Sequence, residues 1–243
     1  MTTTLDRRSP SPVGSPVVHP RHRAGRGRRR WPLFGVGAGV SGLAAALLAA
    51  PPDLVRDGPT GVAILDQLDR GDHHLAFLLG LLSNSCLLVA STGWKRWADE
   101  RAGDDLAART IPTALAATAA VNVVGVTMAG SLALRLPGGA DHGQLAPEGQ
   151  LANLHVLELG LLVGWWTTVV AALCVASLAF RDRGVLQRWM GVVSVVLVLP
   201  AIGTAVVTAL PGLAGLTMPV WLVVISAGMM LSPSANRPPS LLR

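Results

Sequence analysis

One stretch of the sequence decides the fold: residues 154–180 read LHVLELGLLVGWWTTVVAALCVASLAF, and Glu158 is the only charged residue in them. A run this long and this apolar exceeds the roughly 20 residues that a helix needs to cross a bilayer. Backbone N–H and C=O groups in lipid must be satisfied within their own segment, so the run predicts a transmembrane helix.

The rest of the chain repeats this pattern, so that the chain as a whole predicts six spans. They cover about residues 31–50, 73–93, 111–134, 154–180, 190–210 and 214–231. The composition agrees, because 51% of the residues are hydrophobic, only 14% are charged and the mean hydropathy is +0.49. Such values exclude an ordinary soluble domain, and the short alternating segments of a membrane β-barrel are missing. The predicted fold class is therefore an all-α membrane protein, with one six-helix domain over residues 31–231.

The distribution of basic residues predicts the orientation of the chain. Of the 20 Lys and Arg residues, 17 fall on the side of the two termini, and only Arg56, Arg70 and Arg135 fall on the other side. The positive-inside rule therefore places both termini in the cytoplasm. Four tryptophans mark the predicted inner ends of the helices, as an interfacial aromatic belt would: Trp31, Trp94, Trp97 and Trp189.

The N-terminal tail, residues 1–30, holds the excess of positive charge. Residues 1–31 contain eight Arg and one Asp. Its Pro, Ser, Gly and Arg residues predict a disordered cytoplasmic tail, as does the composition of residues 232–243. We expect the N-terminal tail to set the topology and to contact anionic lipid heads, and not to bind nucleic acid. Arg29-Arg30 before an apolar run also fits a twin-arginine export signal. The apolar run is longer than the core of such a signal, and no A-x-A cleavage site follows it. Whether the first span is retained or cleaved stays open.

The first outer loop, residues 51–72, is acidic and contains a short amphipathic pattern. In residues 60–69, Val62, Leu65 and Leu68 recur at intervals of three, with acids between them. This spacing predicts a short amphipathic helix that covers the outer ends of the spans.

Polar residues gather at the predicted outer ends of the second and fourth spans: His73, His74, His155 and Glu158. His155 and Glu158 are three residues apart and share a helix face, and a carboxylate inside the membrane is costly. Glu158 is thus the strongest functional candidate. Three interpretations are a divalent metal site of His74, His155 and Glu158, a proton-coupled transport site, and haem ligation. We expect instead that the histidines lie at the water interface and that Glu158 is a packing residue, with no cofactor.

Other polar and small residues lie inside the spans. Asn84 and Asn122 stand halfway along theirs, where they would hydrogen-bond across helices or bind a substrate. Pro200 and Pro219 predict kinks in the last two spans. Residues 37–42 read GAGVSG, a dinucleotide-binding pattern, but no strand precedes them. This pattern and the spacing of Gly35 with Gly39, Ala38 with Gly42 and Gly160 with Gly164 predict close helix packing. Cys86 and Cys174 are expected to be buried small hydrophobes.

The order of these features resembles a bacterial six-span integral membrane family whose domain has no known function. The features are the segment Val62–Leu82 that runs from the amphipathic helix into the second span, the outer histidine before the fourth span, and the string Arg188-Trp-Met-Gly191 that opens a proline-interrupted fifth span. The resemblance covers roughly residues 30–231. It implies a six-span fold and no activity.

No catalytic or cofactor motif names a reaction. We expect a non-enzymatic structural, sensory or regulatory component of a bacterial inner membrane, with the lipid bilayer and a second copy or another membrane protein as partners. The alternatives are a small-molecule or proton-coupled ion transporter that uses Glu158, Asn84 and Asn122, and a membrane metal or haem protein with its site at the outer face. A polar stripe through the bilayer would favour transport.

Overall fold

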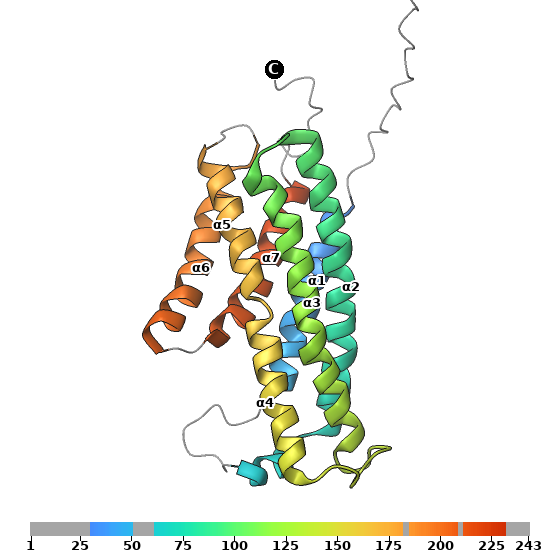
Figure 1. The fold of residues 1–243 in the computed structure, drawn as a ribbon. Helices are drawn as coiled ribbons and strands as arrows, with labels where there is room; N and C mark the ends of the chain where they lie inside the picture. The colour runs from blue at the N-terminus through green and yellow to red at the C-terminus, as the bar shows by residue number, and fades with distance from the viewer. Residues whose placement is uncertain (1–29, 51–60, 182–184, 209–210, 232–243) are drawn as a thin grey trace, which may run out of the picture.

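The computed structural model describes residues 30–50, 61–181, 185–208 and 211–231. Seven α-helices and two short 3₁₀ helices make up this part of the chain, and no strand occurs in it (Figure 1). The α-helices are α1 (Pro32–Ala49), α2 (Arg70–Arg101), α3 (Leu106–Arg135), α4 (Pro147–Val163), α5 (Trp166–Arg181), α6 (Arg188–Thr208) and α7 (Ala214–Leu231). The 3₁₀ helices are η1 (Gly61–Gln67) and η2 (Pro211–Leu213). The tail predicted over residues 1–30 lies outside the described residues except for Arg30, and the tail over 232–243 lies outside them entirely.

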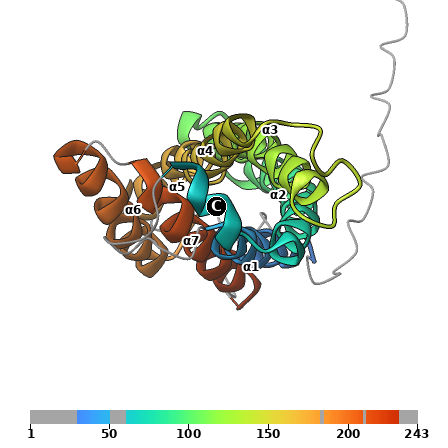
Figure 2. The same ribbon diagram turned by 90° about the horizontal axis from the view of Figure 1, so that it is seen from below.

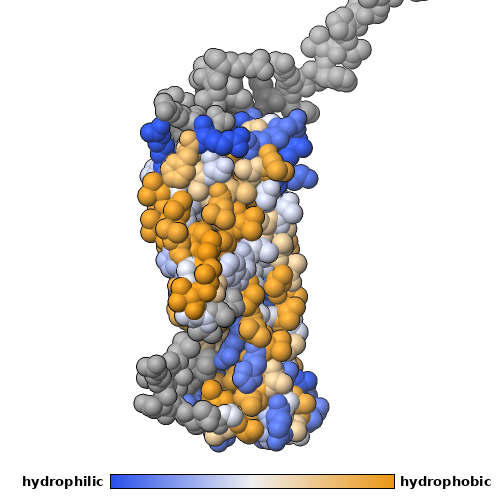
Figure 3. Space-filling view, turned by 60° about the vertical axis from the view of Figure 1, so that its left-hand side comes forward, coloured by the Kyte–Doolittle hydropathy of each residue, from blue (hydrophilic) through white to orange (hydrophobic). Residues whose placement is uncertain are grey.

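Six segments are long and apolar enough to cross a membrane, which confirms the prediction of an all-helical fold with six segments that could span one. They are α1, α2, α3, the α4–α5 pair, α6 and α7. Figure 3 shows a broad hydrophobic surface, with hydrophilic residues at the end where the α2–α3 and α5–α6 connections lie. The predicted amphipathic segment forms the 3₁₀ helix η1, whose Leu65 is buried and which packs against α4.

Two helices begin further out than the hydropathy predicts, because polar side chains cap their N-termini. The Asp69 carboxylate accepts a hydrogen bond from Asp72 N at 3.0 Å and starts α2 three residues before the predicted span. The Asp105 carboxylate accepts hydrogen bonds from Ala107 N at 2.8 Å and Ala108 N at 3.2 Å, and so starts α3. Such caps satisfy N–H groups that the first helical turn leaves without partners.

The fourth span is not one helix, as residues 154–180 predict, but two. The α-helical pattern stops after Val163, turns through Gly164 and Trp165, and starts again at Trp166. A new bond from Thr168 N to Trp165 O, 3.0 Å long, marks the restart. Glycine and the following run of aromatic and β-branched residues, Trp165-Trp166-Thr167-Thr168, have low helix propensity. The fourth span is thus one apolar segment, Pro147–Arg181, interrupted at its centre by a two-residue turn in which Gly164 keeps right-handed helical φ and ψ.

The helices form a ring that is seen end-on in Figure 2. Helix α2 packs between α1 and α3, α3 packs against both α4 and α5, and α7 packs against α1. Helix α6 lies outside this ring against α5 and α7, and it is the least buried of the six spans. Because α3 contacts both α2 and α4, it separates the two helices that carry the predicted outer cluster.

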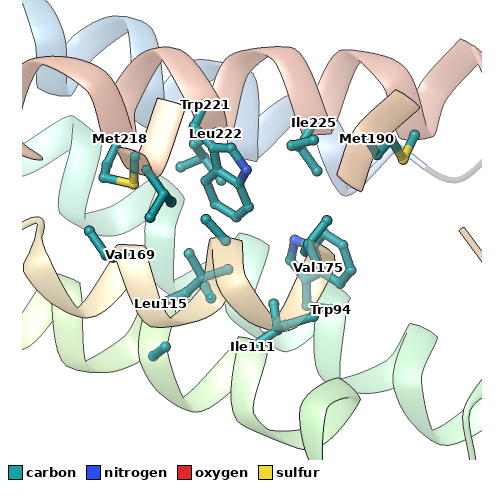
Figure 4. Close-up of a cluster of buried hydrophobic side chains, with 14 of the residues drawn as sticks. Trp94, Ile111, Leu115, Val169, Val175, Met190, Met218, Trp221, Leu222 and Ile225 are labelled. Carbon is teal, nitrogen blue, oxygen red and sulfur yellow. The ribbon is translucent and has the colours of Figure 1, made fainter. Parts of the chain in front are cut away.

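Large side chains fill the interior of the ring (Figure 4). Trp94, Trp97, Trp165 and Trp221 are all fully buried, and the Trp221 indole N–H donates to Ser194 Oγ at 2.8 Å. The interfacial belt predicted at the inner ends is thus wrong for Trp94 and Trp97, which lie in the core. Trp189 is 40% exposed, as a belt residue would be. The aromatic packing of Trp94 against Trp31, with ring centroids 5.5 Å apart, explains why it turns inward.

Close approach of helix backbones depends on the small residues that the sequence singles out. A Cβ atom on Gly160 would lie 2.6 Å from Gly125 Cα, so α3 and α4 touch backbone to backbone there. Gly39 of α1 lies equally close to the Pro219 carbonyl oxygen and to Val223 of α7. Without a hydrophobic driving force between helices in lipid, this close contact is a main source of attraction between them.

We expect Gly160→Ala to lower the free energy of unfolding by about 1 to 3 kcal/mol, because the new methyl group meets backbone atoms that cannot move aside alone. The measurement is unfolding of the detergent-solubilised protein by heat or denaturant. Gly203→Ala is the matched control, since a Cβ atom there meets nothing within 4 Å. It should be neutral or stabilise by up to about 1 kcal/mol through helix propensity. Equal effects of the two variants would contradict the α3–α4 contact.

Candidate functional site

The predicted outer cluster does not form one site. His74 is exposed on α2 and His155 is exposed on α4, where its ring Nδ1 lies 2.9 Å from its own helix's Leu151 carbonyl oxygen. Glu158 is half-buried. It lies one helical turn before Leu162, which packs against Gly212 and Gly215, so it faces the start of α7 and not α2. Among the described residues, no three His, Cys, Asp or Glu side chains stand close enough together to hold a metal ion.

We expect the triple variant His74→Ala, His155→Ala, Glu158→Ala to have the same metal content as the wild type. The three side chains do not come together as a group of ligands in the described structure, and a stable site for a transition metal needs three or four ligands at bonding distance. Elemental analysis of the purified proteins is the measurement. Stoichiometric metal in the wild type that the variant loses would show that these side chains converge in another state of the protein.

His73 behaves differently from its neighbour, because it points into the bundle. Only 2% of it is exposed. Its ring Nδ1 lies 2.9 Å from the Asp69 carbonyl oxygen, whereas its Nε2 is buried without a hydrogen-bond partner. A buried polar atom without a partner is costly, so this end of the bundle interior offers a polar contact that nothing in the described structure uses.

The two asparagines in the middle of the bilayer lie side by side on neighbouring helices. Gly80 of α2 meets Val126 of α3, and one helical turn along each antiparallel helix brings Asn84 level with Asn122. Both are buried, with 6% and 3% exposure. Neither Nδ2 nor Oδ1 of Asn84 has a hydrogen-bond partner, and neither does Asn122 Oδ1. The predicted bonding across helices is not made.

The break in the fourth span lies against this pair of asparagines. Gly164 is in direct contact with the side-chain amide of Asn122. The ring of Trp165 and the Ser83 hydroxyl both lie against Gly42 of α1. Backbone hydrogen bonds continue on both sides of the break, from Gly164 N to Gly160 O at 3.1 Å and from Thr168 N to Trp165 O at 3.0 Å. Just beyond it, Thr118 Oγ1 lies 2.6 Å from Thr167 Oγ1 and 2.7 Å from Thr168 Oγ1.

The inner end of α2 continues the pattern of buried polar atoms without partners. The indole N–H groups of Trp94 and Trp97 are buried, and no hydrogen-bond partner meets them in the described structure. Between them and the middle, Ser91 Oγ donates to the Pro112 carbonyl oxygen at 2.8 Å. Ser83 Oγ likewise donates to the Ala38 carbonyl oxygen at 2.8 Å.

We define the polar stripe of α2 as His73, Asn84, Trp94 and Trp97, of which Trp97 lies about a sixth of a turn beyond Trp94 around the helix. All four residues belong to the buried face of the helix. His73, Asn84 and Trp94 fall within about a quarter of a helical turn of one another and extend over roughly 30 Å, which is the thickness of the hydrocarbon core. The stripe thus places buried hydrogen-bonding atoms near both ends and near the middle of α2.

The sequence predicts the two asparagines of this site but not the break in the fourth span. Asn84 and Asn122 stand out in the sequence because amides are rare at the centre of apolar blocks. Trp165 and the break do not stand out in the sequence. Gly164 before the string Trp-Trp-Thr-Thr, a run of low helix propensity, is the feature that could have predicted them. The fold is that of an all-helical protein with six helical segments apolar enough to cross a membrane, the fourth interrupted at Gly164 and Trp165. No protein-family model, curated protein or solved structure matches this chain.

A separate hollow lies between the inner halves of α6 and α7. Trp189, Val223 and Gly228 line it, and its lining is almost entirely apolar. It opens on the side of the bundle away from the polar stripe and holds no unpartnered buried polar atom of the described chain.

Proposed function

We propose that this chain is a non-enzymatic membrane protein that carries a small solute across the bilayer along the polar stripe of α2. The observation that supports this function is the set of unpartnered buried atoms at three depths of the membrane. A protein with only a structural role gains nothing from amides that make no hydrogen bond, since each costs free energy of about 1 to 3 kcal/mol. A passing solute would satisfy these groups in turn.

The break between α4 and α5 supports the same function. Transporters place discontinuous helices at their binding sites near the middle of the bilayer, where the helix ends supply polar groups without a full charge. Here the break contacts Asn122 and carries Trp165, and both face the interior of the ring. The site is therefore the level of the membrane at which a solute would be held.

We further propose that the protein lies in a bacterial inner membrane with both termini in the cytoplasm. We expect a fluorescent protein fused after Arg243 to fold and fluoresce in a bacterial host. Alkaline phosphatase fused into the α3–α4 connection, near His142, should be active because that enzyme folds only outside the cytoplasm. The reverse result at both positions would contradict the orientation that the basic residues predict.

Access of water to the stripe is the test of the proposed function. In a background where Cys86 and Cys174 are replaced by Ser, Asn84→Cys should react with a small charged thiol reagent that cannot cross lipid. A thiol reacts as its thiolate, which forms in water and not in hydrocarbon. The control is Leu88→Cys, one turn along α2 on its outer face, where the wild-type side chain is 52% exposed to the surroundings of the bundle. Equal, slow reaction at both positions would refute a path along α2.

A further inference from the structure

The hydrogen-bonding atoms of Asn84 and Asn122 match an uncharged solute that both donates and accepts hydrogen bonds. Asn84 presents a free NH₂ group and a free carbonyl oxygen, and Asn122 presents a free carbonyl oxygen. A cation would use only the oxygens and leave the Asn84 donor without a partner. An anion would use only the donor. A neutral solute with both kinds of group satisfies all three atoms.

The lack of charged side chains in the described interior also favours an uncharged solute. The buried polar residues of the described chain are one histidine and otherwise serine, threonine and asparagine, so this part contains no buried Asp, Glu, Lys or Arg. An ion in the middle of the ring would have no side chain of opposite charge, and an unpaired charge in a low dielectric is very costly.

The packing around the break limits the size of the solute. Trp165 is 1% exposed, and its ring lies against Gly42, so that a Cβ atom on that glycine would come within 2.5 Å of the ring. A bulky molecule could pass only if this ring moved away. We propose that the site between Asn84, Asn122 and the α4–α5 break binds and passes small uncharged solutes with hydrogen-bond donors and acceptors, such as amides of the size of urea.

This inference rests on the proposed function, and flux measurements test it. Protein in lipid vesicles is exposed to gradients of urea, of sodium chloride and of potassium chloride, and the fluxes are followed by light scattering and ion-sensitive dyes. We expect urea to cross faster than in protein-free vesicles, and Asn84→Leu to reduce the protein-dependent flux by about three- to thirtyfold, the loss of one buried hydrogen bond. Sodium and potassium fluxes should stay at the protein-free level.

The matched control is Ser85→Ala, at the same depth on the exposed face of α2, where the hydroxyl bonds only to Leu81 O of its own helix. It should leave the urea flux unchanged. If Asn84→Leu is not monodisperse, Asn122→Leu replaces it with the same expectation. Sodium or potassium flux that these variants abolish, without urea flux, would overturn the neutral-solute inference and leave the carrier function standing. No flux of any probe, together with an unreactive Asn84→Cys, would overturn both.

Discussion

Asn84→Leu is expected to raise the free energy of unfolding by about 1 to 3 kcal/mol, although it removes a polar group from the centre of the protein. The reason is that neither polar atom of Asn84 has a hydrogen-bond partner in the described structure, while only 6% of the residue is exposed. Leucine has a similar shape and loses no hydrogen bond on burial. Reversible unfolding in mixed detergent micelles is the measurement.

Thr118→Val is the control for this prediction. Thr118 is fully buried like Asn84, but its hydroxyl lies within hydrogen-bond distance of Thr167, Thr168 and the Ala114 carbonyl oxygen. Valine would leave its two threonine neighbours with one partner fewer, so we expect a loss of roughly 1 kcal/mol. If Asn84→Leu destabilised the protein as much as Thr118→Val, the asparagine would be a structural residue and the polar stripe would lose its middle member.

If Asn84→Leu stabilises the protein and also lowers the solute flux, the wild-type asparagine lowers the stability of the fold in exchange for function. Such residues persist when activity needs a group that the folded state does not. The neighbouring Ser83 and Ser91 show the contrast, because both hydroxyls donate to backbone carbonyl oxygens of adjacent helices. Ser83 and Ser91 thus find partners on neighbouring helices, whereas both polar atoms of Asn84 do not.

The fold class could be predicted from the sequence because it depends on the length and apolarity of segments, which are local properties. The break at Gly164 could not be predicted, since hydropathy is the same for a continuous span and a discontinuous one. The outer histidines illustrate a second limit. His73 and His74 are adjacent in sequence, yet one is buried and the other exposed. Which of them faces the interior depends on how α2 is rotated between α1 and α3, and a nearly uniform apolar segment has no periodicity that reports this.

The asparagine pair lies between these cases. Hydropathy places Asn84 and Asn122 at the same depth, because each is halfway along its span. Their adjacency follows from the contact of Gly80 with Val126, which sets the register of α2 against α3. That two such neighbours make no hydrogen bond to each other is a property of the three-dimensional arrangement alone. The polar stripe is therefore visible only when burial and hydrogen bonding are known for every turn of α2.

Trp165→Ala is expected to have the largest effect of any single substitution at the site: a loss of about 3 to 5 kcal/mol in the free energy of unfolding and a gain in flux. The ring is 1% exposed and fills the space between the α4–α5 break and Gly42. Removing it leaves a cavity beside Gly42 and Ser83, next to the break, where a larger neutral solute, such as glycerol or erythritol, can pass. Unfolding and vesicle light scattering measure the two effects.

Trp221→Ala separates the loss of packing from the opening of a path. Trp221 is also fully buried in the same core, but its indole N–H has a partner of its own, the Ser194 hydroxyl of α6. We expect a loss of stability of similar size, since a tryptophan ring is removed from a packed core in both variants. Flux of glycerol should rise only in Trp165→Ala. A rise in both variants would mean that general loosening admits the solute, and a rise in neither would remove Trp165 from the proposed path.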